Sequence, residues 1–197
     1  MPPQHNHVGV RQWVGAMALY ALLVAASVFV MINVHELGHT VFARLFGDTD
    51  AFYALYKLHP DGSVACIGCN VYDETKISPF GNSVVALGGL IFSQGLALAL
   101  LWYKSKTKKN GLIGRFIGVL IAVCVFDAVF QVAQGIIVNT AQQTAFTRVD
   151  MADFIWLVTR HVEVSPVAVK GLVLMALLVY LLWFIRIYRK MNVANLN

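Results

Sequence analysis

Long apolar runs alternate with shorter polar segments along this chain of 197 residues. Four of the runs cover about 13–46, 79–103, 112–138 and 167–188. A bilayer core requires about 20 residues of helix, so each run is long enough to cross one. The pattern therefore predicts an all-α polytopic membrane protein with about four transmembrane helices.

The segment that follows the first run has a different pattern. Two mixed stretches, 52–58 and 63–71, flank the sequence His59-Pro60-Asp61-Gly62. A Pro-Asp-Gly sequence between two such stretches is typical of a hairpin turn. We therefore expect a small β-hairpin over about 52–72, packed near the end of the first helix.

The length of the chain leaves room for one domain, which we place at 13–190. The polar residues 1–12 are expected to form a disordered tail, and 191–197 a short C-terminal tail. The first apolar run is much longer than that of a signal peptide, so no cleavable signal is expected. Between the last two runs, Met151–Val158 predicts a short helix at the membrane interface, with Trp156 as an anchor.

The composition agrees with a membrane location. Hydrophobic residues make up 58% of the chain and charged residues only 13%, whereas a soluble domain carries about 25% charged residues. Lipid must therefore cover much of the outer surface, which makes the bilayer itself an expected partner.

The positive charges indicate an orientation. The net charge is +5, and the cations gather in the loop 104–115 and after the last run, at 186–190. Cations in short loops beside apolar segments are typical of the cytoplasmic side. With four spans, both termini would be cytoplasmic in a multi-pass protein of the cell membrane, and the hairpin would face outside. The sequence has no basic groove with interleaved aromatic residues, so nucleic acid is not an expected partner.

Three cysteines are too few for a disulfide framework. Cys66-Ile-Gly-Cys69 is a single CxxC sequence, and Cys124 lies alone in the third run. The pair is compatible with a disulfide, a redox pair, half of a metal site, or two small residues in a turn. The last interpretation is the simplest, and it is the one that we favour from the sequence.

The clearest candidate for chemistry is His35-Glu36-Leu37-Gly38-His39, near the end of the first run. Residues four apart share one face of a helix, so the two imidazoles can hold one Zn²⁺. The glutamate is then placed to accept a proton from water that the metal activates. Three ionisable residues within five positions of an apolar helix favour a function. The alternative is a helix end whose polar residues lie at the water interface.

A catalytic zinc site usually has a third protein ligand. The position six residues after His39, which some metalloproteases fill with histidine, is Leu45, and the downstream Glu74 and Glu163 lie outside the apolar helices. Asp127 lies in the middle of the third run, where an unpaired carboxylate is costly. We therefore favour Asp127 as the third ligand. A protonated aspartate that hydrogen-bonds to another helix is the alternative.

Four further polar residues are candidates for the site. Asp150 and Asp153 are alternative ligands, because they flank the outer interface expected for the histidines, whereas Asp127 would lie roughly 10 Å deeper in the membrane. Asn82 and Ser93 are candidates for holding the backbone of a substrate. Asn82 is also suited to cap the start of the second helix, and Ser93 to form part of a small-residue packing face.

These residues together resemble the site-2 protease family of intramembrane zinc metalloproteases, and particularly its compact bacterial branch. The resemblance covers about 20–160: a helix with the HExxH sequence, a short β region, a glycine-rich second helix and a third helix with an aspartate. The family's Leu-Asp-Gly motif is Phe126-Asp127-Ala128 here, and its Gly-Pro-x-x-Asn motif is Gly89-Leu90-Ile91-Phe92-Ser93.

The resemblance implies a zinc-dependent endopeptidase that cleaves membrane-associated or transmembrane proteins. The two histidines and Asp127 would bind Zn²⁺, and Glu36 would be the general base. In the compact branch an aspartate after the third helix recurs, to which Asp150 or Asp153 could correspond. One alternative is a catalytically inactive relative that binds metal or a partner. Another is a metal transporter, which the nearly apolar spans disfavour.

Overall fold

The computed structural model describes residues 10–59, 61–107, 111–138 and 149–193. Within these residues the chain forms five α-helices, and a two-stranded antiparallel hairpin follows the first of them. The elements are α1 (Val10–Leu45), β1 (Phe52–Leu58), β2 (Val64–Val71), the 3-10 helix η1 (Glu74–Lys76), α2 (Pro79–Lys106), α3 (Leu112–Ile137), α4 (Asp150–Val162) and α5 (Pro166–Val193).

Helices α1, α2, α3 and α5 are long and apolar enough to cross a membrane. The predicted fold class is therefore confirmed, and the chain is a multi-pass membrane protein. Helices α2 and α5 continue past the predicted ends, to Lys106 and Val193, because cationic side chains suit the last turn of a helix even where they end its apolar run. The predicted tails are too long, because residues 10–12 belong to α1 and residues 191–193 to α5. Residues 1–9 and 194–197 lie outside the described residues.

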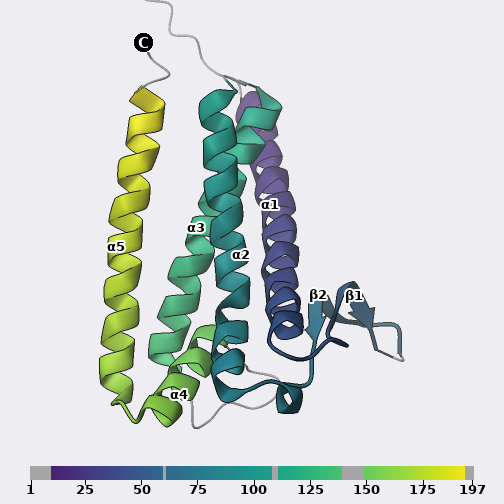
Figure 1. Ribbon diagram of the computed structural model, residues 1–197. Coiled ribbons are helices and arrows are strands. Elements are labelled where there is room, and N and C mark those ends of the chain that lie inside the picture. Colours follow the sequence, from purple (N-terminus) through teal and green to yellow (C-terminus); the bar gives the residue numbers. More distant parts are fainter. Residues whose placement is uncertain (1–9, 60, 108–110, 139–148, 194–197) are drawn as a thin grey trace, which may run out of the picture.

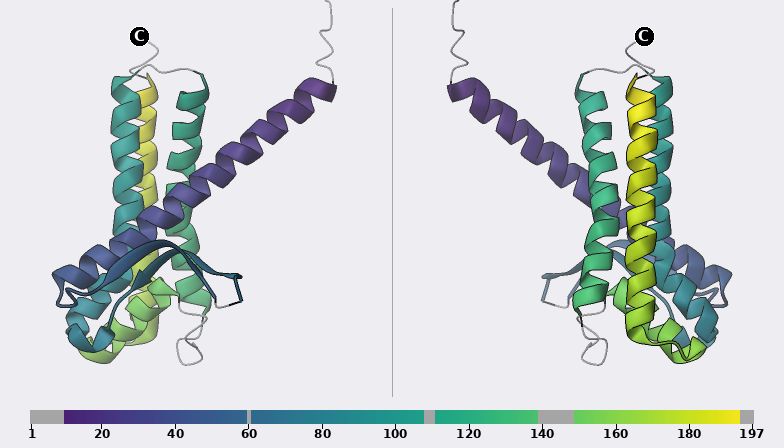
Figure 2. Two further views of the ribbon diagram at one scale, coloured as in Figure 1. Left: turned by 90° about the vertical axis from the view of Figure 1, so that its right-hand side faces the viewer. Right: turned by 90° about the vertical axis from the view of Figure 1, so that its left-hand side faces the viewer.

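The helices are arranged as a bundle that α1 crosses obliquely. Helices α2, α3 and α5 run side by side, and α1 passes across them at a steep angle (Figure 2). The start of α1 and the end of α5 lie at one end of the bundle, whereas the hairpin and α4 lie at the other (Figure 1). Only the second half of α1 is therefore packed closely against the bundle.

The crossing of α1 and α2 depends on two glycines. A Cβ atom on Gly38 would lie 2.3 Å from the carbonyl oxygen of Gly88, and a Cβ atom on Gly88 would lie 2.9 Å from the carbonyl oxygen of Gly38. The two backbones are therefore in direct contact, as small residues allow in membrane helices. Because Gly38 lies between His35 and His39, this contact turns both histidines toward α2.

The predicted hairpin is confirmed, with β1 and β2 paired antiparallel; Pro60 of its turn lies outside the described residues. The sequence-based interpretation of the CxxC pair is wrong, because Cys66 and Cys69 form a disulfide. Gly68 between them has a left-handed φ of 62°, a conformation that glycine adopts without strain. Gly68 also lies against α1, where an added Cβ atom would be 3.3 Å from Cγ of Glu36.

Helix α4 covers the end of the bundle. Its first half buries Met151 and Ile155, which pack with Val132 of α3 and Val169 of α5. Trp156, the expected interface anchor, is 41% exposed. The helix continues one turn beyond the predicted C-terminal end, to Val162, and the apolar residues of its first half are buried against α3 and α5. This packing places the first residue of α4, Asp150, beneath α1.

Candidate metal centre

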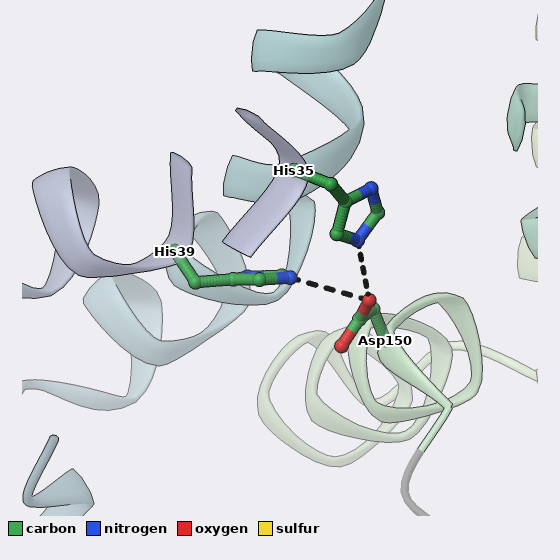
Figure 3. Close-up of side chains that lie close together, drawn as sticks. All are labelled: His35, His39 and Asp150. Carbon is green, nitrogen blue, oxygen red and sulfur yellow. Dashed lines mark hydrogen bonds and ion pairs between the residues drawn. The ribbon is translucent and has the colours of Figure 1, made fainter. Parts of the chain in front are cut away.

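Three side chains from two distant helices meet at one point. The Nε2 atom of His35 lies 2.9 Å from Oδ2 of Asp150, and the Nε2 atom of His39 lies 3.2 Å from the same oxygen. Both rings point toward the carboxylate from α1, and the carboxylate points up from the start of α4 (Figure 3). Within the described residues, this is the one group of three or more His, Cys, Asp or Glu whose ligand atoms lie within 4.8 Å of one another.

The opposite nitrogen of each imidazole has a fixed acceptor. His39 Nδ1 lies 2.7 Å from the carbonyl oxygen of Val85 in α2, and His35 Nδ1 lies 3.0 Å from Oδ2 of Asp127 in α3. A neutral imidazole that donates from Nδ1 carries its lone pair on Nε2. Both lone pairs then point at the carboxylate of Asp150, so that three electron-rich atoms converge. A cation between them would satisfy all three.

Two further observations fit a bound metal ion. His39 Nε2 is buried and makes no hydrogen bond within the described residues, although Oδ2 of Asp150 lies 3.2 Å away, as expected where an ion would lie between the two atoms. A Cβ atom on Gly89 would lie 2.3 Å from His35 Nε2 and 2.6 Å from His39 Nε2. The absence of a side chain at this position of α2 therefore keeps space beside both nitrogens. Two imidazoles and one carboxylate are also the donor set of many catalytic zinc sites.

Asp127, which the sequence favoured as the third ligand, has a different place. It lies on Nδ1 of His35, on the side of the ring opposite to the point where His35, His39 and Asp150 meet. The expected difference in depth between Asp127 and the histidines does not keep them apart, because Oδ2 of Asp127 lies only 3.0 Å from Nδ1 of His35. Asp153, the other candidate, lies on α4 but is not part of the group of three.

Asp150 is held in the form that binds cations. Burial by itself would raise the pKa of its carboxyl group, but without a metal ion the imidazoles of His35 and His39, protonated on Nε2 in that state, interact favourably with the carboxylate and lower that pKa below its ordinary value. The side chain remains one-third exposed, whereas both histidines are 95% buried or more. The carboxylate is therefore ionised, and it lies at the more accessible edge of the site.

Glu36 lies beside this point and is anchored by the hairpin. Its Oε2 accepts a hydrogen bond from the side-chain amide of Asn70 in β2. Asn33, one turn earlier on α1, likewise accepts a hydrogen bond from the hydroxyl of Tyr53 in β1. Sequence reasoning missed Asn70, for which the only available signal was a polar residue in the strand predicted to pack near the first helix.

The two residues considered for substrate binding have structural partners. Ser93 is completely buried, and its hydroxyl donates to Oδ2 of Asp127 at 2.6 Å. The amide of Asn82 donates to the carbonyl oxygens of Glu74 and Ile77, at 3.1 and 3.4 Å, and so joins η1 to the start of α2. The capping interpretation of Asn82 is wrong, because Ser78 caps α2 by accepting a hydrogen bond from the backbone N–H of Gly81. The burial of Ser93 keeps it from a substrate.

Comparisons of the chain with protein-family models, with curated proteins and with solved structures found no match.

Proposed function

We propose that this chain is a zinc-dependent endopeptidase that cleaves membrane-associated or transmembrane protein substrates. The observation that carries the proposal is that the ligand atoms of His35, His39 and Asp150 lie within 4.8 Å of one another. Both histidines and the adjacent Glu36 belong to a helix that is apolar enough to cross a membrane. Two histidines one helical turn apart with an intervening glutamate are typical of zinc peptidases. The resemblance of the sequence to site-2 proteases supports the same reaction.

The side chains of the chain would hold and orient the metal. His35, His39 and Asp150 would contribute two nitrogens and one oxygen, which leaves a fourth position open, as catalysis requires. Asp127 and the carbonyl group of Val85 would fix both imidazoles in the tautomer that presents Nε2. Zn²⁺, when bound, supplies a Lewis acid that polarises the peptide carbonyl group and makes water a better nucleophile.

Glu36 would move the proton. Its carboxylate lies on the same turn of α1 as the histidines, and Asn70 holds it from the hairpin. In peptide hydrolysis it would accept a proton from the attacking water and deliver that proton to the nitrogen of the leaving amine. Asn70 would limit the rotation of the Glu36 side chain, so that its free oxygen faces the reacting water.

The hairpin would present the substrate. A peptide bond inside a membrane helix is protected by its hydrogen bonds, so a substrate must unwind before it can be hydrolysed. In the described part of the chain the sheet has two strands, so each strand has a free edge. An extended substrate paired to β2 would be guided past Asn70 and hence past Glu36.

The proposed orientation follows from charge and from the disulfide. The basic residues of the loop 104–115 and of the end of α5 would face the cytoplasm, with both termini, in the cell membrane. The hairpin and the metal centre lie at the opposite end of the bundle (Figure 1). That end would face an oxidising compartment, in which the disulfide between Cys66 and Cys69 persists.

The test combines zinc content with cleavage of a transmembrane peptide by the purified protein in nanodiscs. The parental protein should contain about one zinc per chain and lose cleavage on treatment with a chelator. Asp150→Ala should lose zinc and cleavage together, whereas Glu36→Gln should keep zinc and lose cleavage. Asp153→Asn is the matched control on the same helix, and it should keep both.

Two results would contradict the proposal. Cleavage by Glu36→Gln at the parental rate would remove the assigned base. A parental protein that binds neither zinc nor any other divalent transition metal would contradict the assignment of a metal centre. Retention of zinc by Glu36→Gln distinguishes loss of the base from loss of the fold.

A further inference from the structure

A chain of hydrogen bonds leads from His35 across the bundle to α5. Asp127 Oδ2, which contacts His35 Nδ1, also accepts a hydrogen bond from Ser93 Oγ at 2.6 Å. Ser93 Oγ accepts one from Gln94 Nε2 at 3.1 Å. Gln94 Oε1 accepts one from the hydroxyl group of Tyr180 at 2.7 Å. The chain of contacts thus joins α1, α3, α2 and α5.

Each step of this chain fixes the orientation of the next. The Ser93 hydroxyl has two acceptors within reach, Asp127 Oδ2 at 2.6 Å and its own helix carbonyl at Leu90 at 3.1 Å. The shorter contact, to the carboxylate of Asp127, is the stronger one for the proton, and donation by Gln94 to the Ser93 oxygen limits the rotation of the hydroxyl group. The amide of Gln94 is fixed in turn, because its nitrogen donates to the Cys124 carbonyl at 2.6 Å and its oxygen accepts from α5.

The outer part of the chain lies in apolar surroundings. Gln94 and Tyr180 border a cavity of about 640 Å³ between α2, α3, α4 and α5, and the other residues that line it are apolar. A polar group that loses its partner there finds few replacements and remains unsatisfied. The hydrogen bond between Tyr180 and Gln94 is therefore a strong constraint on the orientation of the amide.

We infer that Gln94 and Tyr180 are positioning residues for the metal-binding histidine. They act through Ser93 and Asp127, which hold the ring of His35 so that its Nε2 faces the metal position. Neither residue touches that position. Because Tyr180 lies on α5, the placement of this outer helix is coupled to the geometry of the metal centre. The inference rests on the proposed function and adds to it the residues that support the metal centre from a distance.

Metal affinity tests the inference without any assay of cleavage. The zinc dissociation constant of the purified full chain is measured by competition with a chelator. Partners of a ligating histidine typically change metal affinity about 10- to 100-fold when they are removed. Asp127→Asn should therefore raise the dissociation constant by that factor. Gln94→Leu should raise it about tenfold, and Tyr180→Phe, the most distant, about threefold.

Matched controls separate this effect from general destabilisation. Tyr188→Phe removes the same hydroxyl group from an exposed position of α5, and Ser83→Ala removes a buried hydroxyl group that bonds only the carbonyl of Pro79 within α2. Both should keep the parental dissociation constant. The decisive variant combines Tyr180→Phe with Asp127→Asn, in which the contribution of Tyr180 should diminish because the carboxylate through which Ser93 acts on the histidine is replaced.

The outcomes are distinguishable. Parental zinc affinity in both Gln94→Leu and Tyr180→Phe overturns the inference and leaves the proposed function intact. An undiminished effect of Tyr180→Phe beside Asp127→Asn also overturns it, because the coupling then takes another route. Parental protein without zinc defeats the proposed function and the inference together. If the variants show the expected graded zinc affinities but the parental protein cleaves no peptide, the inference is supported and the protease assignment is lost. If Gln94→Leu does not fold, the comparison of Tyr180→Phe with Tyr188→Phe decides.

Discussion

The substitution Gly89→Ala would place a methyl group against both metal-binding imidazoles. The added carbon would lie 2.2 Å from Cδ2 and 2.3 Å from Nε2 of His35, and 2.6 Å from Nε2 of His39. Zinc binding requires both nitrogens to lie about 2.0–2.1 Å from the ion, so a methyl group that displaces the rings disturbs the site. Carbon and nitrogen in contact are ordinarily about 3.5 Å apart, so each ring would have to withdraw by about 1 Å.

The size of the effect follows from this overlap. Inserting a methyl group into packed surroundings typically costs about 1–3 kcal/mol, and about 1.4 kcal/mol corresponds to a factor of ten in a binding constant. Withdrawal of both imidazoles also lengthens both metal contacts. We therefore expect the zinc dissociation constant of Gly89→Ala to rise about 10- to 100-fold. Cleavage should fall in proportion to the loss of bound zinc.

The assay is chelator competition on the purified protein, with thermal unfolding of the metal-free form as the check on folding. Gly95→Ala is the matched control, because a Cβ atom at this position of α2 meets nothing within 4 Å. It should bind zinc as the parental protein does and be equally or more stable, since alanine favours a helix over glycine by about 0.5–1 kcal/mol. A parental dissociation constant in Gly89→Ala would refute the proposed position of the ion.

Three further predictions concern the scaffold. Gly38→Ala should lower the midpoint of thermal unfolding by several degrees, because its Cβ would lie 2.3 Å from a backbone carbonyl oxygen of α2; an unchanged midpoint would contradict the close crossing. The backbone N–H of Asp73 lowers the pKa of Asp48, so the stabilisation that this carboxylate provides is complete above about pH 4 and is lost as the pH falls through the lowered pKa. The difference in unfolding free energy between the parental protein and Asp48→Asn should therefore shrink on acidification, and a constant difference would contradict this cause. Thiol-blocking reagents followed by mass spectrometry should modify Cys66 and Cys69 only after reduction, and modification without a reductant would show that they are not paired.

The fold could be predicted from the sequence where local signals are strong. Apolar runs of more than 20 residues define the spans whatever their neighbours are, and Pro-Asp-Gly marks the hairpin turn. The oblique course of α1 could not be predicted, because it follows from the contact of Gly38 with Gly88, two residues that are far apart in the chain. The contact between Asn70 and Glu36 joins the hairpin to α1, and it is a tertiary feature as well.

The metal centre shows a sharper limit of the same kind. The HExxH sequence specifies two imidazoles and a base because residues 35, 36 and 39 share one helix, so local geometry suffices. The third ligand comes from another helix, and its identity depends on how far α4 reaches beneath α1. Packing of Met151 and Ile155 against α3 and α5 sets that reach. No local pattern encodes it.

The presence of two suitable aspartates has a physical reason. An imidazole has two nitrogens on opposite edges of its ring, and both need partners when the ring is buried. In this chain one carboxylate serves each nitrogen of His35: Asp127 lies 3.0 Å from Nδ1, and Asp150 lies 2.9 Å from Nε2. The rule that a membrane-embedded carboxylate needs a partner is satisfied equally by a metal ion and by the N–H group of a metal-binding histidine. That rule therefore singles out Asp127, which lies in a membrane-spanning helix, but it cannot show which of the two partners Asp127 has. The choice of the metal ligand requires the partner of His39, since only Asp150 reaches both imidazoles.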